Sequence, residues 1–237
     1  MKDITEIIKK TYKAVVDEYN KIFIENRYLP TKKAKQASLV INGFTERNLT
    51  FNFCHAYLKQ HPNAIVWQEI PIEKVKNQHV DSIIIDKDED LVIYIEAKRL
   101  YDISHFEKLL EDFSRIEYRY SKIPIPPTQK PLKNKAVVLL ADHYYSGEIK
   151  NKKLKEDYYD VFFNGKKIKV MDELSNYGRN LLEMIDSAKI RICKDIDIHS
   201  SIIIPKGNDY NIGINKDIIY TIYCGVYYLD GSEKNKQ

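Results

Sequence analysis

Two apolar runs separated by five consecutive charged residues constrain the fold of this chain more than any other feature. The first run covers residues 80–85, the second covers residues 91–98, and the charged segment covers residues 86–90. A polar segment between runs rich in Ile and Val indicates a β-hairpin. Because both faces of each run are apolar, we expect the two strands to be buried on both sides within a larger sheet.

The length of the turn predicts which residues of the two strands face each other. If residues 87–90 form the loop, Asp86 pairs with Leu91, and counting back along both strands places Asp81 opposite Glu96. Side chains alternate between the faces of a strand, so Glu96 and Lys98 point the same way and Asp81 joins them. A turn one residue longer or shorter would shift this register.

Two carboxylates that face each other on paired strands need a cation nearby. Like charges at opposed positions destabilise a sheet, and two negative charges about 4 Å apart repel by roughly 4 kcal/mol at an effective dielectric constant of about 20. Lys98 supplies one positive charge, and Mg²⁺, which prefers carboxylate oxygens, would supply two more. The alternative is a surface hairpin with solvated charges, which the apolar residues on both faces oppose.

Asp81, followed after fourteen residues by Glu96-Ala97-Lys98, resembles the active-site motif of the PD-(D/E)XK nuclease superfamily. The resemblance implies that Asp81, Glu96 and the carbonyl of Ala97 bind Mg²⁺, for which Mn²⁺ can substitute. It also implies that Lys98 orients or deprotonates a water molecule, or stabilises the transition state. We expect orientation and charge stabilisation, because the neighbouring carboxylates oppose the depressed pKa that a basic lysine requires.

An acidic residue on a helix before the hairpin is a further element of this superfamily. Residues 44–58 predict a helix with Thr45 as its N-cap and Glu46 in its first turn. By resemblance, Glu46 would approach the metal site, directly or through water, and help to hold a second metal ion. The alternative is that Glu46 only complements the helix dipole. Glu69, on a strand predicted at residues 66–72, is another candidate, with a solvent-facing charge on an edge strand as its alternative.

The order of the predicted elements matches the core of the superfamily. The resemblance covers residues 45–140, although Val80 stands where the family has proline. It implies an α/β protein with a restriction-endonuclease-like core, in which helices flank a central mixed β-sheet. The expected elements are helices at residues 3–23, 44–58, 104–120 and 172–185, strands at residues 66–72, 80–85, 91–98, 135–141, 201–204 and 218–229, and a hairpin around Asn164-Gly165.

These elements divide the chain into three parts. Residues 1–44 form an N-terminal helix and a basic loop, residues 45–142 form the nuclease-like core, and residues 143–237 form a β-rich C-terminal elaboration that could belong to the same domain. The N-terminal helix could pack on the core or make a dimer contact, and packing is the expected outcome.

Composition limits the class of protein without specifying its function. The chain has 38 basic and 34 acidic residues, and its net charge of +4 is too small to indicate nucleic-acid binding by itself. Its three cysteines, Cys54, Cys193 and Cys224, lack metal-site or disulfide spacing, which favours a reducing cytoplasm. No stretch is long and apolar enough to predict a membrane span.

Together these features predict a Mg²⁺-dependent DNA endonuclease of the cytoplasm, a type II restriction or defence enzyme. It would act on double-stranded DNA, as a monomer or a homodimer, and the sequence does not assign its DNA-binding residues. Two alternatives stay open: a repair or recombination nuclease with the same site, and a non-enzymatic nucleic-acid-binding protein that keeps the fold. The fold alone does not decide between them, but the intact Asp81, Glu96 and Lys98 set opposes the last.

Overall fold

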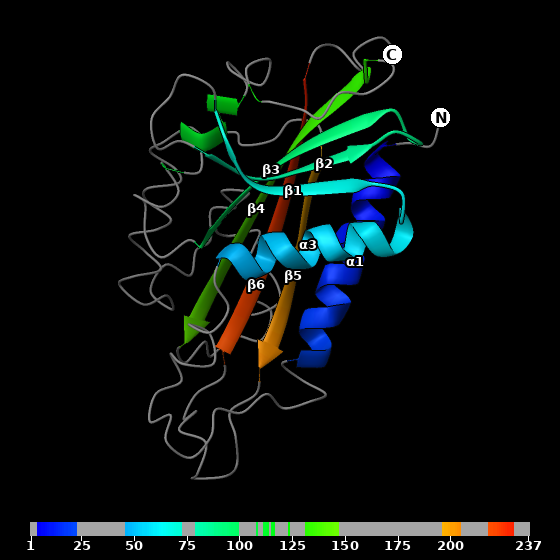
Figure 1. Ribbon diagram of the computed structural model, residues 1–237. Helices are drawn as coiled ribbons and strands as arrows, with labels where there is room; N and C mark the ends of the chain where they lie inside the picture. The colour runs from blue at the N-terminus through cyan, green and yellow to red at the C-terminus, as the bar shows by residue number, and fades with distance from the viewer. Residues whose placement is uncertain are drawn as a thin grey trace.

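The computed structural model describes residues 4–22, 46–72, 79–99, 108, 111–113, 115–116, 123, 131–146, 196–204 and 218–229. Six strands form one mixed sheet in the order β1-β2-β3-β4-β6-β5 (Figure 1). They are β1 (Ile65–Pro71), β2 (His79–Asp86), β3 (Leu91–Arg99), β4 (Asn134–Ser146), β5 (Ile196–Ile204) and β6 (Ile218–Leu229), and two helices accompany them, α1 (Ile4–Asn20) and α3 (Glu46–Gln60). The predicted α/β class and mixed sheet are confirmed.

The hairpin at the centre of the sequence pattern has the predicted register. β2 and β3 pair antiparallel, with Asp86 opposite Leu91 and Ser82 opposite Ile95. Residues 87–90 form the turn. Continuing the same register by one residue places Asp81 beside Glu96.

The side chain of Asp86 fixes this turn to helix α3. Its Oδ1 accepts the backbone amides of Asp88 and Glu89 at 3.0 and 3.1 Å. Its Oδ2 accepts the hydroxyl of Tyr57 at 2.9 Å and lies 3.0 Å from Nδ1 of His61. Because Asp86 is buried and both oxygens are used, local turn chemistry and tertiary packing support the same register.

The remaining pairings extend the sheet on both sides of the hairpin. β1 pairs antiparallel with β2, and β4 lies parallel to β3. β6 pairs antiparallel with β4 and β5, so the C-terminal strands belong to the same sheet. β5 begins before the strand predicted at residues 201–204, and β6 has the predicted bounds. The hairpin and helix predicted at residues 164–165 and 172–185, and Cys193, lie outside the described residues.

Two hydrophobic clusters cover the two faces of the sheet. Helices α1 and α3 pack on one face, where Ile93, Ile95 and Ala97 of β3 point toward them. The packing expected for the N-terminal helix is therefore confirmed, and Figure 1 shows α3 crossing in front of the strands. Val92 and Tyr94 belong to the other cluster, so the alternation along β3 places Glu96 and Lys98 on the face opposite α1 and α3.

Helical residues of the β3–β4 crossover cover that second face. Described residues 108, 111–113 and 115–116 are helical, and Ile116 and Phe113 pack in the second cluster. We call these residues the crossover helix.

Among the helices of the described residues, none is long and apolar enough to span a membrane.

Candidate active site

The side chain of Asp81 is fixed against the neighbouring strand. The ladder between β2 and β3 ends at the pair of Ser82 and Ile95. Beyond it, the amide of Ala97 donates to Oδ2 of Asp81 at 2.8 Å. A carboxylate therefore takes over as acceptor where the backbone pairing stops, which holds Asp81 beside Glu96.

Helix α3 brings a second carboxylate to the end of β3. Glu46 is the first residue of α3. Its Oε1 accepts the backbone amide of Arg99 at 3.0 Å, and its Oε2 lies 3.8 Å from Nζ of Lys98. The helix-borne acid thus lies against the strand that carries Glu96 and Lys98.

The crossover helix adds two residues that the sequence did not reveal as site residues. Oδ2 of Asp112 lies 3.2 Å from Nζ of Lys98, and its Oδ1 lies 2.6 Å from Nη2 of Arg115. The same Nη2 lies 3.5 Å from Oε1 of Glu96. Arg115 therefore joins Asp112 to Glu96. The three-residue spacing of Asp112 and Arg115 predicts their own contact, but no sequence signal indicates that the helix packs over Glu96.

These contacts produce a cluster in which negative charge exceeds positive charge. If all groups are ionised, the four carboxylates and two cations that the described residues bring together leave a net charge of −2. The carboxylates are Glu46, Asp81, Glu96 and Asp112, and the cations are Lys98 and Arg115. Glu96 is only 1% exposed, so water cannot screen this excess efficiently.

Burial and mutual repulsion make the two central carboxylates reluctant to ionise. Burial is the main cause that raises the pKa of Glu96 well above its ordinary range, and the charges of Asp81 and Asp112 add to it against Arg115 and Lys98. Burial also raises the pKa of Asp81, although the hydrogen bond from Ala97 and the charge of Lys98 oppose the shift. The ionised pair therefore requires additional positive charge.

Lys98 is held in its charged form. Burial alone would lower its pKa, but the carboxylates of Asp112, Glu46 and Asp81 outweigh burial and the pKa is raised. A lysine in this state is a poor general base at neutral pH. The electrostatics therefore favour the orienting and charge-stabilising role over proton abstraction.

The expected magnesium ligands come from two side chains and one backbone carbonyl. Among the described residues, no three His, Cys, Asp or Glu side chains form a group that could hold a metal ion. The expected set of Asp81, Glu96 and the Ala97 carbonyl contains only two carboxylates, which is typical of Mg²⁺ because this ion binds few protein ligands and retains several waters. Arg115 would have to share or release Oε1 of Glu96 when an ion binds.

Glu69 lies at the margin of the site, on edge strand β1. Its backbone has φ of 53°, a left-handed conformation that is uncommon for a non-glycine residue. Its side chain is 55% exposed and lies 3.5 Å from Arg47. These features agree with the solvent-facing alternative for Glu69.

No protein-family model matches this chain, and no curated protein or solved structure matches it either. Function must therefore be inferred from the chemistry of the site itself.

Proposed function

We propose that this chain is a Mg²⁺-dependent endonuclease that hydrolyses phosphodiester bonds in DNA, of the restriction or defence type. The observation that supports the proposal is the charge imbalance at the end of β3. A purely structural ion-pair network gains little from uncompensated buried carboxylates. A divalent cation and a phosphate group would satisfy the carboxylates and the two cations together.

The residues of the site divide into ion ligands and positively charged partners. Asp81 and Glu96 would hold Mg²⁺ with the carbonyl of Ala97, and Glu46 would take part directly or through water. When bound, the ion neutralises phosphate charge and lowers the pKa of a coordinated water. Lys98 remains a cation that orients the water and stabilises negative charge on the phosphoryl oxygens.

A non-enzymatic nucleic-acid-binding protein is the second candidate. Two observations favour it: the described residues contain no three-side-chain metal cage, and Arg115 approaches the oxygen of Glu96 that an ion would need. In such a protein, Arg115 would replace the metal as the counterion of Glu96. A repair or recombination nuclease would share the site of the first candidate and differ in the DNA that it selects.

Cleavage of supercoiled plasmid separates these functions. We expect cutting with Mg²⁺ or Mn²⁺, none with EDTA, and none by Asp81→Asn or Glu96→Gln proteins that stay folded by circular dichroism. Lys87→Ala is a control for a charge change outside the site, because Lys87 is exposed in the turn at the other end of the hairpin. Discrete fragments would favour a restriction enzyme, whereas cuts confined to junctions or flaps would favour a repair enzyme. DNA binding without metal-dependent cutting would contradict the proposal and favour the binding protein.

A further inference from the structure

The outward side of α3 carries a row of exposed cationic and aromatic side chains. Arg47, Phe51, His55 and Lys59 follow one another at intervals of four residues and are all exposed. The side chain of Arg47 is 86% exposed, and Phe51 is 54% exposed. Since residues four apart share one side of a helix, these four form a continuous stripe, which we call the α3 row. At about 1.5 Å per residue, the row is about 18 Å long.

The α3 row begins at the candidate active site. Arg47 directly follows Glu46, whose carboxylate contacts Lys98 and the amide of Arg99. The partner of Arg47 is Glu69, and both side chains of this pair are more than half exposed. Exposed ion pairs contribute little to stability because water screens them. A phosphate group could therefore replace Glu69 beside Arg47.

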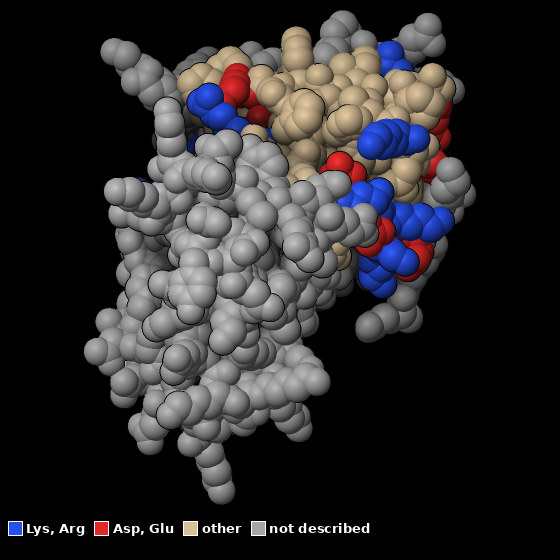
Figure 2. All heavy atoms as spheres, turned by 90° about the horizontal axis from the view of Figure 1, so that it is seen from below, with Lys and Arg blue, Asp and Glu red and all other residues tan. Residues whose placement is uncertain are grey.

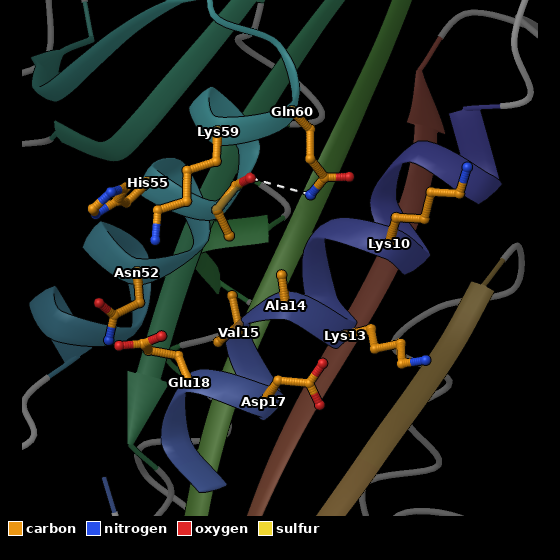
Figure 3. Close-up of a pocket in the computed structure, with 11 residues that line it drawn as sticks. Lys10, Lys13, Ala14, Val15, Asp17, Glu18, Asn52, His55, Lys59 and Gln60 are labelled. Atoms are coloured by element: carbon orange, nitrogen blue, oxygen red, sulfur yellow. Dashed lines mark hydrogen bonds between the residues drawn. The ribbon is translucent and has the colours of Figure 1, made fainter. Parts of the chain in front are cut away.

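The other end of the row lies beside a groove between α1 and α3. His55 and Lys59 line this groove, which has a volume of about 340 Å³ (Figure 3). Asp17 and Glu18 line it from α1, and Figure 3 shows Glu18 pointing toward Asn52. Lys10 and Lys13 also line the groove from α1, so its charges are mixed and it does not by itself attract or repel a polyanion. The exposed side chains of the α3 row are therefore the surface considered for a bound strand.

The chemistry of the row fits an unpaired nucleic-acid strand. Single strands offer phosphates to cations and open base faces to aromatic rings, and such stacking tolerates any base. The rings of Phe51 and His55 make a T-shaped contact at a centroid distance of 5.8 Å, which leaves at least one face of the half-exposed Phe51 ring free of this contact. In a duplex, the base faces are already stacked and Phe51 would have no partner.

We propose that the α3 row binds single-stranded nucleic acid and leads it to the candidate active site, with Phe51 stacking on a base and Arg47 contacting a phosphate. The proposal rests on the proposed nuclease function, and a substrate with unpaired nucleotides favours the repair or recombination type of nuclease over the restriction type, which cuts duplex DNA. Charges of both signs lie next to each other on the described part of the face in Figure 2. Binding is thus expected to depend on this local row instead of on a broad positive field.

Binding of labelled oligonucleotides in EDTA tests the row without cleavage. With a short thymidine strand, we expect Phe51→Ala to raise Kd by about 5- to 150-fold, the loss of one stacked base. Phe51→Tyr should keep most of the affinity. Arg47→Gln should reduce the slope of log K against log salt by about 0.7, the value for one phosphate contact on a single strand. A duplex of the same length should bind more weakly and respond little to Phe51→Ala.

Two control variants match the charge and the apolar area that are removed. Lys87→Ala deletes an exposed cation away from the row, and Ile65→Ala trims a side chain that is 39% exposed on β1. Both should bind the single strand like the wild-type protein. If Phe51→Ala also binds like wild type, if the duplex binds better, or if wild type binds no single strand, the proposed row is wrong.

The outcomes for the row and for the nuclease are separable. Metal-dependent cleavage that is insensitive to Phe51→Ala and Arg47→Gln would contradict the proposed role of the α3 row and support the nuclease proposal. If the single strand binds in a way that depends on Phe51 but no metal-dependent cleavage occurs, the role of the α3 row is supported and the nuclease proposal is wrong.

Discussion

A buried ion pair ties the end of β3 to β4, and Asp142 of this pair also contacts β6, so its loss should be measurable. Nε and Nη2 of Arg99 donate to Oδ1 and Oδ2 of Asp142 at 3.0 and 2.7 Å. The two side chains are 3% and 1% exposed, and the hydroxyl of Tyr220 on β6 also donates to Asp142. Because Asp142→Asn keeps the shape but removes the charge, it leaves the Arg99 guanidinium buried and uncompensated. Breaking such a pair from one side costs about 3–5 kcal/mol.

Thermal and urea unfolding would measure this cost. For a chain of this size, each 1 kcal/mol lowers Tm by about 2–4 °C, so Asp142→Asn should lower Tm by about 6–20 °C. Tyr220→Phe removes one hydrogen bond to a charged group and should cost less, about 1.5–3 kcal/mol. The double variant Arg99→Met with Asp142→Leu should recover much of the loss, since an apolar pair carries no desolvation penalty. A loss below about 1 kcal/mol for Asp142→Asn would refute this reasoning.

Three further predictions concern the site and the hairpin. The folded-state pKa of Glu96 lies above its ordinary value of 4.5, so the stability linked to this group is present at low pH and is lost as pH rises through the folded pKa. Without metal, Glu96→Gln should therefore be more stable than wild type at pH 7. Urea unfolding should show that this gain in stability vanishes toward pH 4.5. Lys98→Ala should lower the cleavage rate by about 100- to 1,000-fold, the usual loss for one charge-stabilising group, with partial activity in Lys98→Arg, and a wild-type rate would contradict the site assignment. Tyr57→Phe removes the hydroxyl that donates to buried Asp86 and should cost about 1.5–3 kcal/mol in thermal unfolding, so an unchanged Tm would show that Tyr57 does not hold the turn.

The hairpin was predictable because residues close together in the sequence determine how its two strands pair. A charged turn of four residues fixes the pairing of Asp86 with Leu91, and alternation then fixes the face of every residue up to Ile95. Helix α1 was predictable from apolar residues at helical spacing, and α3 from Thr45 as a candidate N-cap. The strand at residues 135–141 was also expected, although β4 runs on to Ser146 because β6 pairs with it over its full length.

The parts of the site that were missed depend on contacts distant in the sequence. Asp112 and Arg115 reach Lys98 and Glu96 only because the crossover helix packs on that face of the sheet. The hydrogen bond from Ala97 to Asp81 replaces regular strand pairing, whereas alternation assumes an unbroken ladder. The left-handed backbone of Glu69 has no glycine to indicate it. Each of these features follows from tertiary packing, which a local pattern does not encode.

Two consecutive residues of β3, Lys98 and Arg99, belong to two clusters that differ in net charge. Arg99 pairs with Asp142, which also accepts the hydroxyl of Tyr220, on the face of α1 and α3, and the ion pair is electrically balanced. Lys98, on the other face, belongs to a cluster with two excess negative charges when all its described groups are ionised. Its other members are Glu46, Asp81, Glu96, Asp112 and Arg115. A balanced buried pair gains little from a ligand, whereas the unbalanced cluster can lose its excess charge by binding either protons or a cation.

Added Mg²⁺ should therefore separate the two clusters in unfolding experiments. An ion at 100 times its Kd stabilises a folded protein by about 2.7 kcal/mol. Wild type and Asp142→Asn should both gain this stability, because Asp142 is not an expected ligand. Glu96→Gln should gain little, since it lacks one of the two carboxylates. An equal gain for all three proteins would mean that magnesium does not bind at the end of β3, and the charge imbalance there would need another explanation.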